Sequence, residues 1–154
     1  MLGSSLSKML LIYGTVLFLL GLLNGLAVQR FKNPRMGLSA HLAAMQNGMV
    51  LWAFGLIWPH AVLGSQAQQW IAFAAVAATY AIWLALLLAA LLGTSRSTPI
   101  AGAGHAAPAP QEHLVSALLA SGSLAHPGDA GLALGVALNG PRRWLPGLPR
   151  LAAE

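Results

Sequence analysis

The sequence predicts an all-α integral membrane protein, a bundle of three to four transmembrane helices. Hydrophobic residues make up 57% of the 154 residues and charged residues only 7%, with a mean hydropathy of +0.70. A soluble domain carries about a quarter charged residues. Each bilayer crossing takes about 20 apolar residues, so this length leaves no room for a separate soluble domain.

The first predicted helix covers residues 9–28 and contains no charged residue. Its apolar run is too long for a signal peptide and no small-residue cleavage site follows, so we expect the helix to be retained. Gly14, Gly21 and Gly25 share one face of it, and small residues spaced in this way predict close contact with another helix. We expect the neighbouring Asn24 to make an interhelical hydrogen bond.

The second and third predicted helices cover residues 40–58 and 70–92. We expect Ser39 to cap the second helix, and Pro59 favours an end just before it. The third helix is the most hydrophobic of the set, and Tyr80 is one of its few polar residues.

A fourth apolar stretch is weaker, and its helix is expected to cover residues 113–125 or longer. The sequence His-Pro-Gly-Asp at 126–129 follows it, and a crossing there would have to absorb both a proline and a carboxylate. We therefore divide the chain into a transmembrane domain, 1–125, and a divergent, weakly apolar C-terminal segment, 126–154. Basic residues are shared equally between the two sides of a four-helix arrangement, so they do not determine its orientation.

Composition also excludes several functional classes. The net charge is +5, but the basic residues are scattered over helix ends and connections, which predicts no nucleic-acid partner. Cysteine is absent, which excludes disulfides and thiolate chemistry. The first three predicted helices contain no carboxylate, which argues against a proton relay, a carboxylate-bridged metal site or an ion-coupled transporter. Histidine is the only strong metal ligand left.

The residue that stands out is His41, an imidazole near the start of the second predicted helix. Polar groups at membrane depth are candidates for function because they are costly to bury. On the same helical face, Ala44 and Gly48 are expected to leave a hollow, and Met45 and Trp52 to supply apolar walls, so a flat cofactor fits there. The alternative is an interfacial histidine bonded to lipid headgroups or to a carbonyl.

Three further residues are candidates for catalysis. Asn47 follows His41 by six residues, which places it roughly 120° away around the helix, so the two cannot ligate one ion together. Asn47 would instead bind a polar substrate or a neighbouring helix. Tyr80 can donate a hydrogen bond or only pack. His105, with His113, supplies acid–base groups if the loop between the third and fourth helices folds back as a lid.

A haem group is one cofactor that His41 would hold. The first and third predicted helices contain no histidine, so one chain cannot clamp haem between two transmembrane histidines. A haem held by His41 alone keeps one axial position open, and an open site on iron acts on substrates.

Four short sequence clusters are similar to motifs of a known family. They are residues 33–42 (NPRMGLSAHL), Asn47-Gly48, Tyr80-Ala81-x-Trp83, and residues 98–105 (TPIAGAGH). Together they resemble the hydroxylaminobenzene mutases over most of the chain, up to about residue 124. More distantly, the spacing from His41 to Asn47-Gly48-Met49 is similar to that of styrene oxide isomerase.

The resemblance implies an isomerase of the bacterial inner membrane, surrounded by lipid, that converts hydroxylaminobenzene to 2-aminophenol. Styrene oxide isomerase holds haem b between the subunits of a trimer, so the resemblance also implies a homotrimer with a histidine ligand. Carried over to this chain, His41 is the metal ligand with Met45 and Gly48 beside the cofactor, and the expected catalytic residues are Asn47, Tyr80 and His105.

Two positions depart from the family pattern. Ile82 stands where a second asparagine is expected, and residues 126–129 interrupt the fourth helix. These departures leave open a second hypothesis, a haem-binding or structural membrane subunit without catalysis of its own.

Overall fold

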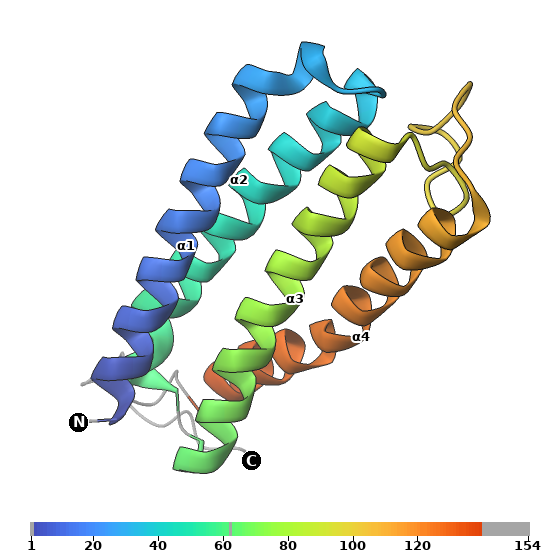
Figure 1. The fold of residues 1–154 in the computed structure, drawn as a ribbon. Coiled ribbons are helices and arrows are strands. Elements are labelled where there is room, and N and C mark those ends of the chain that lie inside the picture. The colour runs from blue at the N-terminus through green and yellow to red at the C-terminus, as the bar shows by residue number, and fades with distance from the viewer. Residues whose placement is uncertain (1, 62, 140–154) are drawn as a thin grey trace, which may run out of the picture.

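The computed structural model describes residues 2–61 and 63–139, with side chains for 5–61 and 63–124. This part of the chain is all-helical, as predicted, and contains no strand (Figure 1). The described chain contains four α-helices and two single 3₁₀ turns: α1 Leu2–Ala27, turn Val28–Arg30, α2 Pro34–Ile57, turn Trp58–His60, α3 Ser65–Leu92 and α4 Ala109–Asn139. The first three helices follow one another after short connections, whereas a longer loop, 93–108, joins α3 to α4.

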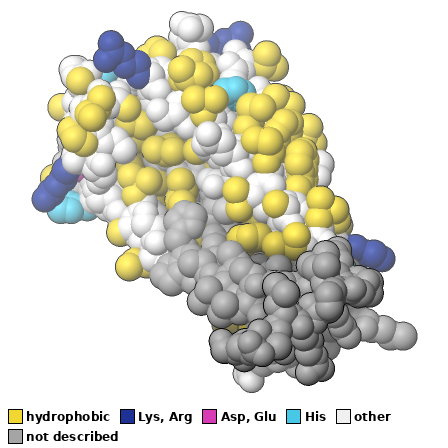
Figure 2. All heavy atoms as spheres, turned by 180° about the vertical axis from the view of Figure 1, so that it is seen from behind, with side chains coloured by type: hydrophobic (Ala, Val, Ile, Leu, Met, Phe, Trp, Pro, Cys, Tyr) yellow, Lys and Arg dark blue, Asp and Glu magenta, His cyan; other side chains and the backbone are white. Residues whose placement is uncertain are grey.

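Three helical segments of the described chain are long and apolar enough to cross a membrane: Ser5–Arg30, Pro34–His60 and Ser65–Leu92. Their surfaces carry large hydrophobic side chains that lie exposed in the single chain, such as Leu26 and Leu56. In the view of Figure 2, apolar side chains spread over the middle of one face, and Lys and Arg side chains lie at its margins. This distribution is that of a membrane protein.

The helices follow one another across the bundle (Figure 1). α1 packs mainly on α2, α2 also contacts α3, and α4 packs mainly on α3. One hydrophobic cluster joins α1, α2 and α3, and a second joins the start of α2 to the end of α3 and the first turns of α4.

The α1–α2 contact is made by small residues, as the glycine spacing predicts. A Cβ atom at Gly14 would lie 2.8 Å from the carbonyl oxygen of Gly48, and one at Gly21 would meet α2 at the same distance. The Asn24 side chain donates a hydrogen bond to the carbonyl of Gly37 at 3.2 Å, so the predicted interhelical bond is also confirmed. The two backbones therefore run close together at the depth of His41.

α2 begins at Pro34, earlier than predicted, because Asn33 and not Ser39 is its N-cap. The Oδ1 atom of Asn33 accepts a hydrogen bond from the N–H of Met36 at 3.1 Å. Proline is favoured at the first helical position, where no N–H is needed. The hydroxyl of Ser39 instead bonds back to the carbonyl of Arg35 at 3.1 Å, inside the helix.

α4 continues through Pro127 to Asn139. A proline inside a helix removes one backbone hydrogen bond and bends the helix without necessarily ending it. The backbone therefore passes through residues 126–129 as part of a helix longer than 113–125, which is the longer alternative left open by the sequence. The division of the chain after residue 125 stays a prediction. The remaining tail, 140–154, lies outside the described residues.

Candidate functional site

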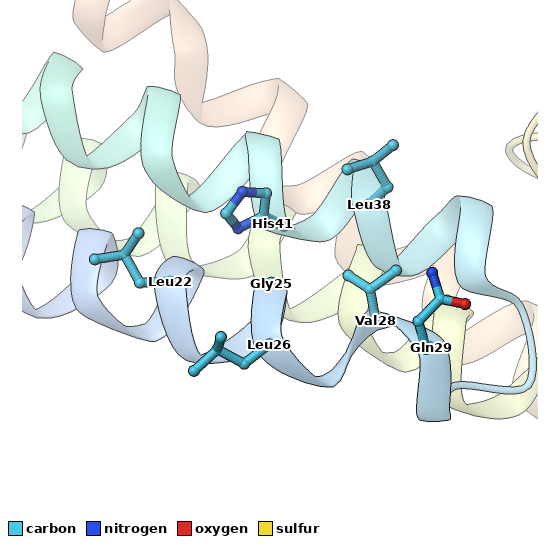
Figure 3. A pocket seen from close by; sticks show the side chains of 7 residues that line it. All are labelled: Leu22, Gly25, Leu26, Val28, Gln29, Leu38 and His41. Carbon is cyan, nitrogen blue, oxygen red and sulfur yellow. The ribbon is translucent and has the colours of Figure 1, made fainter.

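His41 lies between α1 and α2, half-buried, with its ring against the backbone of α1 (Figure 3). Its Nδ1 atom is 2.7 Å from the carbonyl oxygen of Gly21. A carbonyl oxygen only accepts hydrogen bonds, so Nδ1 carries the proton and donates it. In the neutral imidazole the Nε2 atom then keeps its lone pair, and in Figure 3 this second ring nitrogen points away from α1. An imidazole in this state is ready to ligate a metal.

The imidazole borders an open groove of about 410 Å³ on the outside of the α1–α2 pair. Volumes of this size are common for pockets that bind small molecules. The lining comes from the last turns of α1, the turn Val28–Arg30 and the first turns of α2, and it is mostly apolar: Leu22, Gly25, Leu26, Val28, Gln29, Leu38 and His41 (Figure 3).

The hollow predicted beside His41 at Ala44 and Gly48 is filled by α1. Both residues are fully enclosed, and a Cβ atom at Gly48 would lie 2.8 Å from the carbonyl oxygen of Gly14. Small residues on α2 thus admit the neighbouring helix rather than a ligand. Met45 packs close to Gly21 of α1. Cofactor contacts of Met45 and Gly48 stay predictions.

Further along the same face, Trp52 stacks on Phe18 of α1, with ring centroids 5.0 Å apart. Its indole N–H donates to the hydroxyl of Thr15 at 3.0 Å. Trp52 therefore packs against α1 as an aromatic pair and is not among the residues that line the groove beside His41.

Asn47 lies on a different side of α2 from His41. It shares a helical stripe with Met36, eleven residues earlier, and Met36 packs against Ala85 and Ala89 of α3. Asn47 is half-buried, and its side chain makes no hydrogen bond to any of the described residues. Its carboxamide is thus free to bind a polar ligand.

Tyr80 connects α3 to α1. Its hydroxyl donates a hydrogen bond to the carbonyl oxygen of Tyr13 at 2.8 Å, and its ring meets the edges of Tyr13 and Trp83. The indole N–H of Trp83 is buried and has no acceptor in the described part of the chain. The phenol oxygen of Tyr80 keeps its lone pairs available to accept a further hydrogen bond.

His105 lies at one end of the bundle, in the loop between α3 and α4. Its Nε2 atom is 3.0 Å from the carbonyl oxygen of Lys32, so the loop does fold back, but onto the α1–α2 connection. His105 is not among the residues that line the His41 groove, and His113 is exposed on α4. A catalytic role for His105 stays a prediction.

Sequence reasoning missed two features of this region. The first is the contact of Gly25 with His41, because glycine spacing does not reveal which side chain fills the space opposite. The second is Glu112 in the first turn of α4, whose buried carboxylate accepts hydrogen bonds from the backbone N–H groups of Ser95 and Arg96 at 3.0 Å each. An acidic residue just after the start of a helix is a signal that could have indicated such a role.

The comparison with known families decides the class of the protein. The family model described as styrene oxide isomerase matches residues 6–137. The chain belongs to the styrene oxide isomerase family. It is therefore an isomerase, and the hypothesis of a structural subunit without catalysis is not supported. The match extends to residue 137, so the family resemblance reaches further than the expected limit at about residue 124.

Two relatives of this isomerase, both from Ectopseudomonas oleovorans, confirm the resemblance to the hydroxylaminobenzene mutases. Hydroxylaminobenzene mutase HabB is 48% identical over 120 residues, which are 77% of this chain and 73% of HabB. Hydroxylaminobenzene mutase HabA is 44% identical over 109 residues, which are 70% of this chain and 81% of HabA. No solved structure matches the isomerase.

Proposed function

We propose that this membrane isomerase converts hydroxylaminobenzene to 2-aminophenol, with haem b bound to His41. The observation that carries the proposal is the His41 imidazole, which donates from Nδ1 to Gly21 and keeps Nε2 free beside an apolar groove. The names of both mutase relatives supply the substrate class, an aromatic hydroxylamine.

The reaction is an isomerisation that needs no oxidant or reductant. The N–O bond of the hydroxylamine breaks, and a C–O bond forms at the ortho carbon of the ring. That carbon loses a proton, and the nitrogen gains one. Protonation of the oxygen, or its binding to a Lewis acid, weakens the N–O bond and places positive charge on nitrogen and the ring.

The residues present fit a haem group. A histidine that ligates a metal usually donates its other N–H to a carbonyl or carboxylate. In this chain the Gly21 carbonyl accepts that hydrogen bond from His41. Leu22, Leu26 and Leu38 offer the apolar surface that a flat macrocycle needs. Bound to His41, haem iron would supply a Lewis acid that weakens the N–O bond of the substrate.

On the substrate side, we assign hydrogen bonding to Asn47 and Tyr80. Asn47 has an unused amide donor and acceptor among the described residues. Tyr80 already donates to Tyr13, so its oxygen would accept from the N–H or O–H of the hydroxylamine. Holding both polar atoms of the substrate keeps the ring in one orientation and lowers the entropy cost of the transfer.

The assembly we propose is a homotrimer in which a second copy covers the His41 groove. The groove opens on the outer surface of the chain, and His41 and Asn47 point about 120° apart on α2. Both residues serve one reaction most readily if neighbouring copies share the site. Light scattering on the detergent-purified protein tests the trimer, and a monomeric mass with full activity would contradict it.

The activity is tested on purified protein incubated with hydroxylaminobenzene, with 2-aminophenol measured by chromatography. We expect His41→Ala to abolish product formation and Asn47→Ala to lower kcat/KM by about 10²-fold, the typical loss for one hydrogen bond to the transition state. His113→Ala is the matched control, because this histidine is exposed and lies outside the site. Wild-type rates in His41→Ala would refute the proposal.

A further inference from the structure

We infer that Gly25 is a positioning residue for the imidazole of His41. The inference rests on the proposed function, in which His41 holds the cofactor. A Cβ atom at Gly25 would lie 2.7 Å from Nδ1, 2.8 Å from Cε1 and 3.3 Å from Cγ of the His41 ring. These are its three nearest neighbours, so the space that a side chain would take at residue 25 is the space that the ring occupies (Figure 3).

The position of the ring determines which nitrogen is left for a ligand. The ring lies over Gly25, and this brings Nδ1 to 2.7 Å from the Gly21 carbonyl, one turn earlier on α1. A methyl group at residue 25 would push the imidazole away, since contacts below 3.0 Å are essentially never observed for a real Cβ atom. The Nδ1 hydrogen bond would then lengthen or break, and the tautomer would no longer be determined by α1.

Gly25 differs in this respect from the other glycines of the α1–α2 contact. A Cβ atom at Gly14 would meet the Gly48 carbonyl and the Trp52 side chain at 2.8 Å each, and one at Gly55 would meet the side chain of Leu11 at 2.8 Å and the Ser7 carbonyl at 3.1 Å. Those glycines face both backbone and side chains of the other helix, so they let two helices approach. At Gly25 all three nearest atoms belong to the His41 ring.

The test compares Gly25→Ala with Gly55→Ala, a glycine of the same helix pair that has no contact with His41. Both variants are purified in detergent, labelled with ¹⁵N in the histidine ring, and examined by NMR without haem. We expect the Nδ1–H form of His41 to dominate in the wild-type protein and in Gly55→Ala, and to lose its dominance in Gly25→Ala. An unchanged tautomer in Gly25→Ala would overturn the inference.

Titration with ferric haem b gives a second readout. Loss of the partner that orients a metal-ligating histidine weakens binding by about 10- to 100-fold, so we expect this loss in Gly25→Ala and little change in Gly55→Ala. Equal weakening in both variants would mean that helix packing alone matters, and would overturn the inference. If His41→Ala binds haem as the wild-type protein does, the proposed function fails, while the NMR result still decides the role of Gly25.

A double variant covers the case in which Gly25→Ala does not fold. In Gly25→Ala/His41→Ala the ring that a methyl group would contact is absent. We therefore expect the double variant to fold and to have the same Tm as His41→Ala, whereas Gly25→Ala alone has a lower Tm than the wild-type protein or does not fold. A Tm loss of equal size in both backgrounds would assign Gly25 to helix packing and contradict the inference.

Discussion

The side-chain amide of Asn33 donates a hydrogen bond to the carbonyl oxygen of Ala101 at 2.9 Å, so one residue holds the start of α2 and the loop after α3 together. The same side chain caps α2 through Met36, and only 1% of its surface is exposed. At this end of the bundle His105 also bonds to Lys32. The loop after α3 is thereby tied to the α1–α2 connection, close to the first turns of α2 that carry His41.

Replacing Asn33 is expected to destabilise the fold. Asn33→Ala removes the helix cap and leaves the Ala101 carbonyl without this donor, which should cost about 1–3 kcal/mol. Ser39→Ala is the control, because its hydroxyl bonds only within α2, and its effect should stay within about 0.5 kcal/mol. Thermal unfolding in detergent measures the loss of stability in both variants. Equal losses in the two variants would argue against Asn33 as the cap.

Replacing Gly48 by a larger residue is expected to destabilise the contact between α1 and α2. In Gly48→Ala the new methyl group would lie 2.8 Å from the Gly14 carbonyl and 3.1 Å from the backbone nitrogen of Phe18, and neither backbone atom can move without its helix. We expect a loss of about 1–3 kcal/mol, typical of overpacking. Gly64→Ala, with nothing within 4 Å, is the control. A fully stable Gly48→Ala variant would show that α1 and α2 can separate at little cost.

Glu112 is expected to make stability depend on acid pH. It lies outside the three membrane-crossing segments, in the first turn of α4. Burial raises the pKa of its carboxyl group, but hydrogen bonds from backbone N–H groups, including those of Ser95 and Arg96, outweigh burial, so the pKa lies below the ordinary value of 4.5. A depressed pKa contributes stability above pH 4.5 that is lost as the pH falls through the lower folded-state value.

Thermal unfolding as a function of pH tests this relation. The Tm of the wild-type protein should fall below pH 4.5, and Glu112→Gln should remove most of that dependence. The sequence contains only two other carboxylate side chains, Asp129 and Glu154. Asp129→Asn is the control and should keep the acid dependence. If the Tm of Glu112→Gln depends on pH in the same way as the Tm of the wild-type protein, the expectation is wrong.

Tyr80 is expected to act through its hydroxyl group. Tyr80→Phe removes the bond to the Tyr13 carbonyl and should change stability by less than about 1 kcal/mol, whereas kcat should fall by about 10²-fold if the oxygen binds the substrate. Tyr13→Phe is the matched control, because Tyr13 contributes its backbone carbonyl, which the substitution keeps. Steady-state kinetics on both variants distinguish a role of the Tyr80 hydroxyl in substrate binding from a role in packing. An unchanged kcat in Tyr80→Phe would assign Tyr80 to packing alone.

The sequence predicts the helices and the main contact face well. Gly14 and Gly21 meet α2 as their spacing on one helical face requires. The start of α2 is not decided by composition, because both Asn33 and Ser39 are good capping residues. Pro34 favours the earlier start, since it suits a first helical position and no N–H is lost.

The functional site is harder to predict from the sequence than the helices are, because small residues in a membrane helix are compatible with two different structures. Ala44 and Gly48 allow either an empty space or a close helix, and only the position of α1 decides between them. Likewise, a histidine in a membrane helix signals function, but the carbonyl that holds it belongs to Gly21, whose backbone has no sequence signature. The orientation of His41 thus depends on a tertiary contact that the pattern of residues does not specify.

The visible absorption spectrum of the purified protein tests the central claim, that His41 binds haem iron through its free nitrogen, most directly. Protein produced with ample haem should show a Soret band corresponding to one haem per chain, and the band should be absent from His41→Ala while His113→Ala retains it. A wild-type protein that forms 2-aminophenol at full rate without bound haem, or a His41→Ala variant with an unchanged band, would contradict the claim.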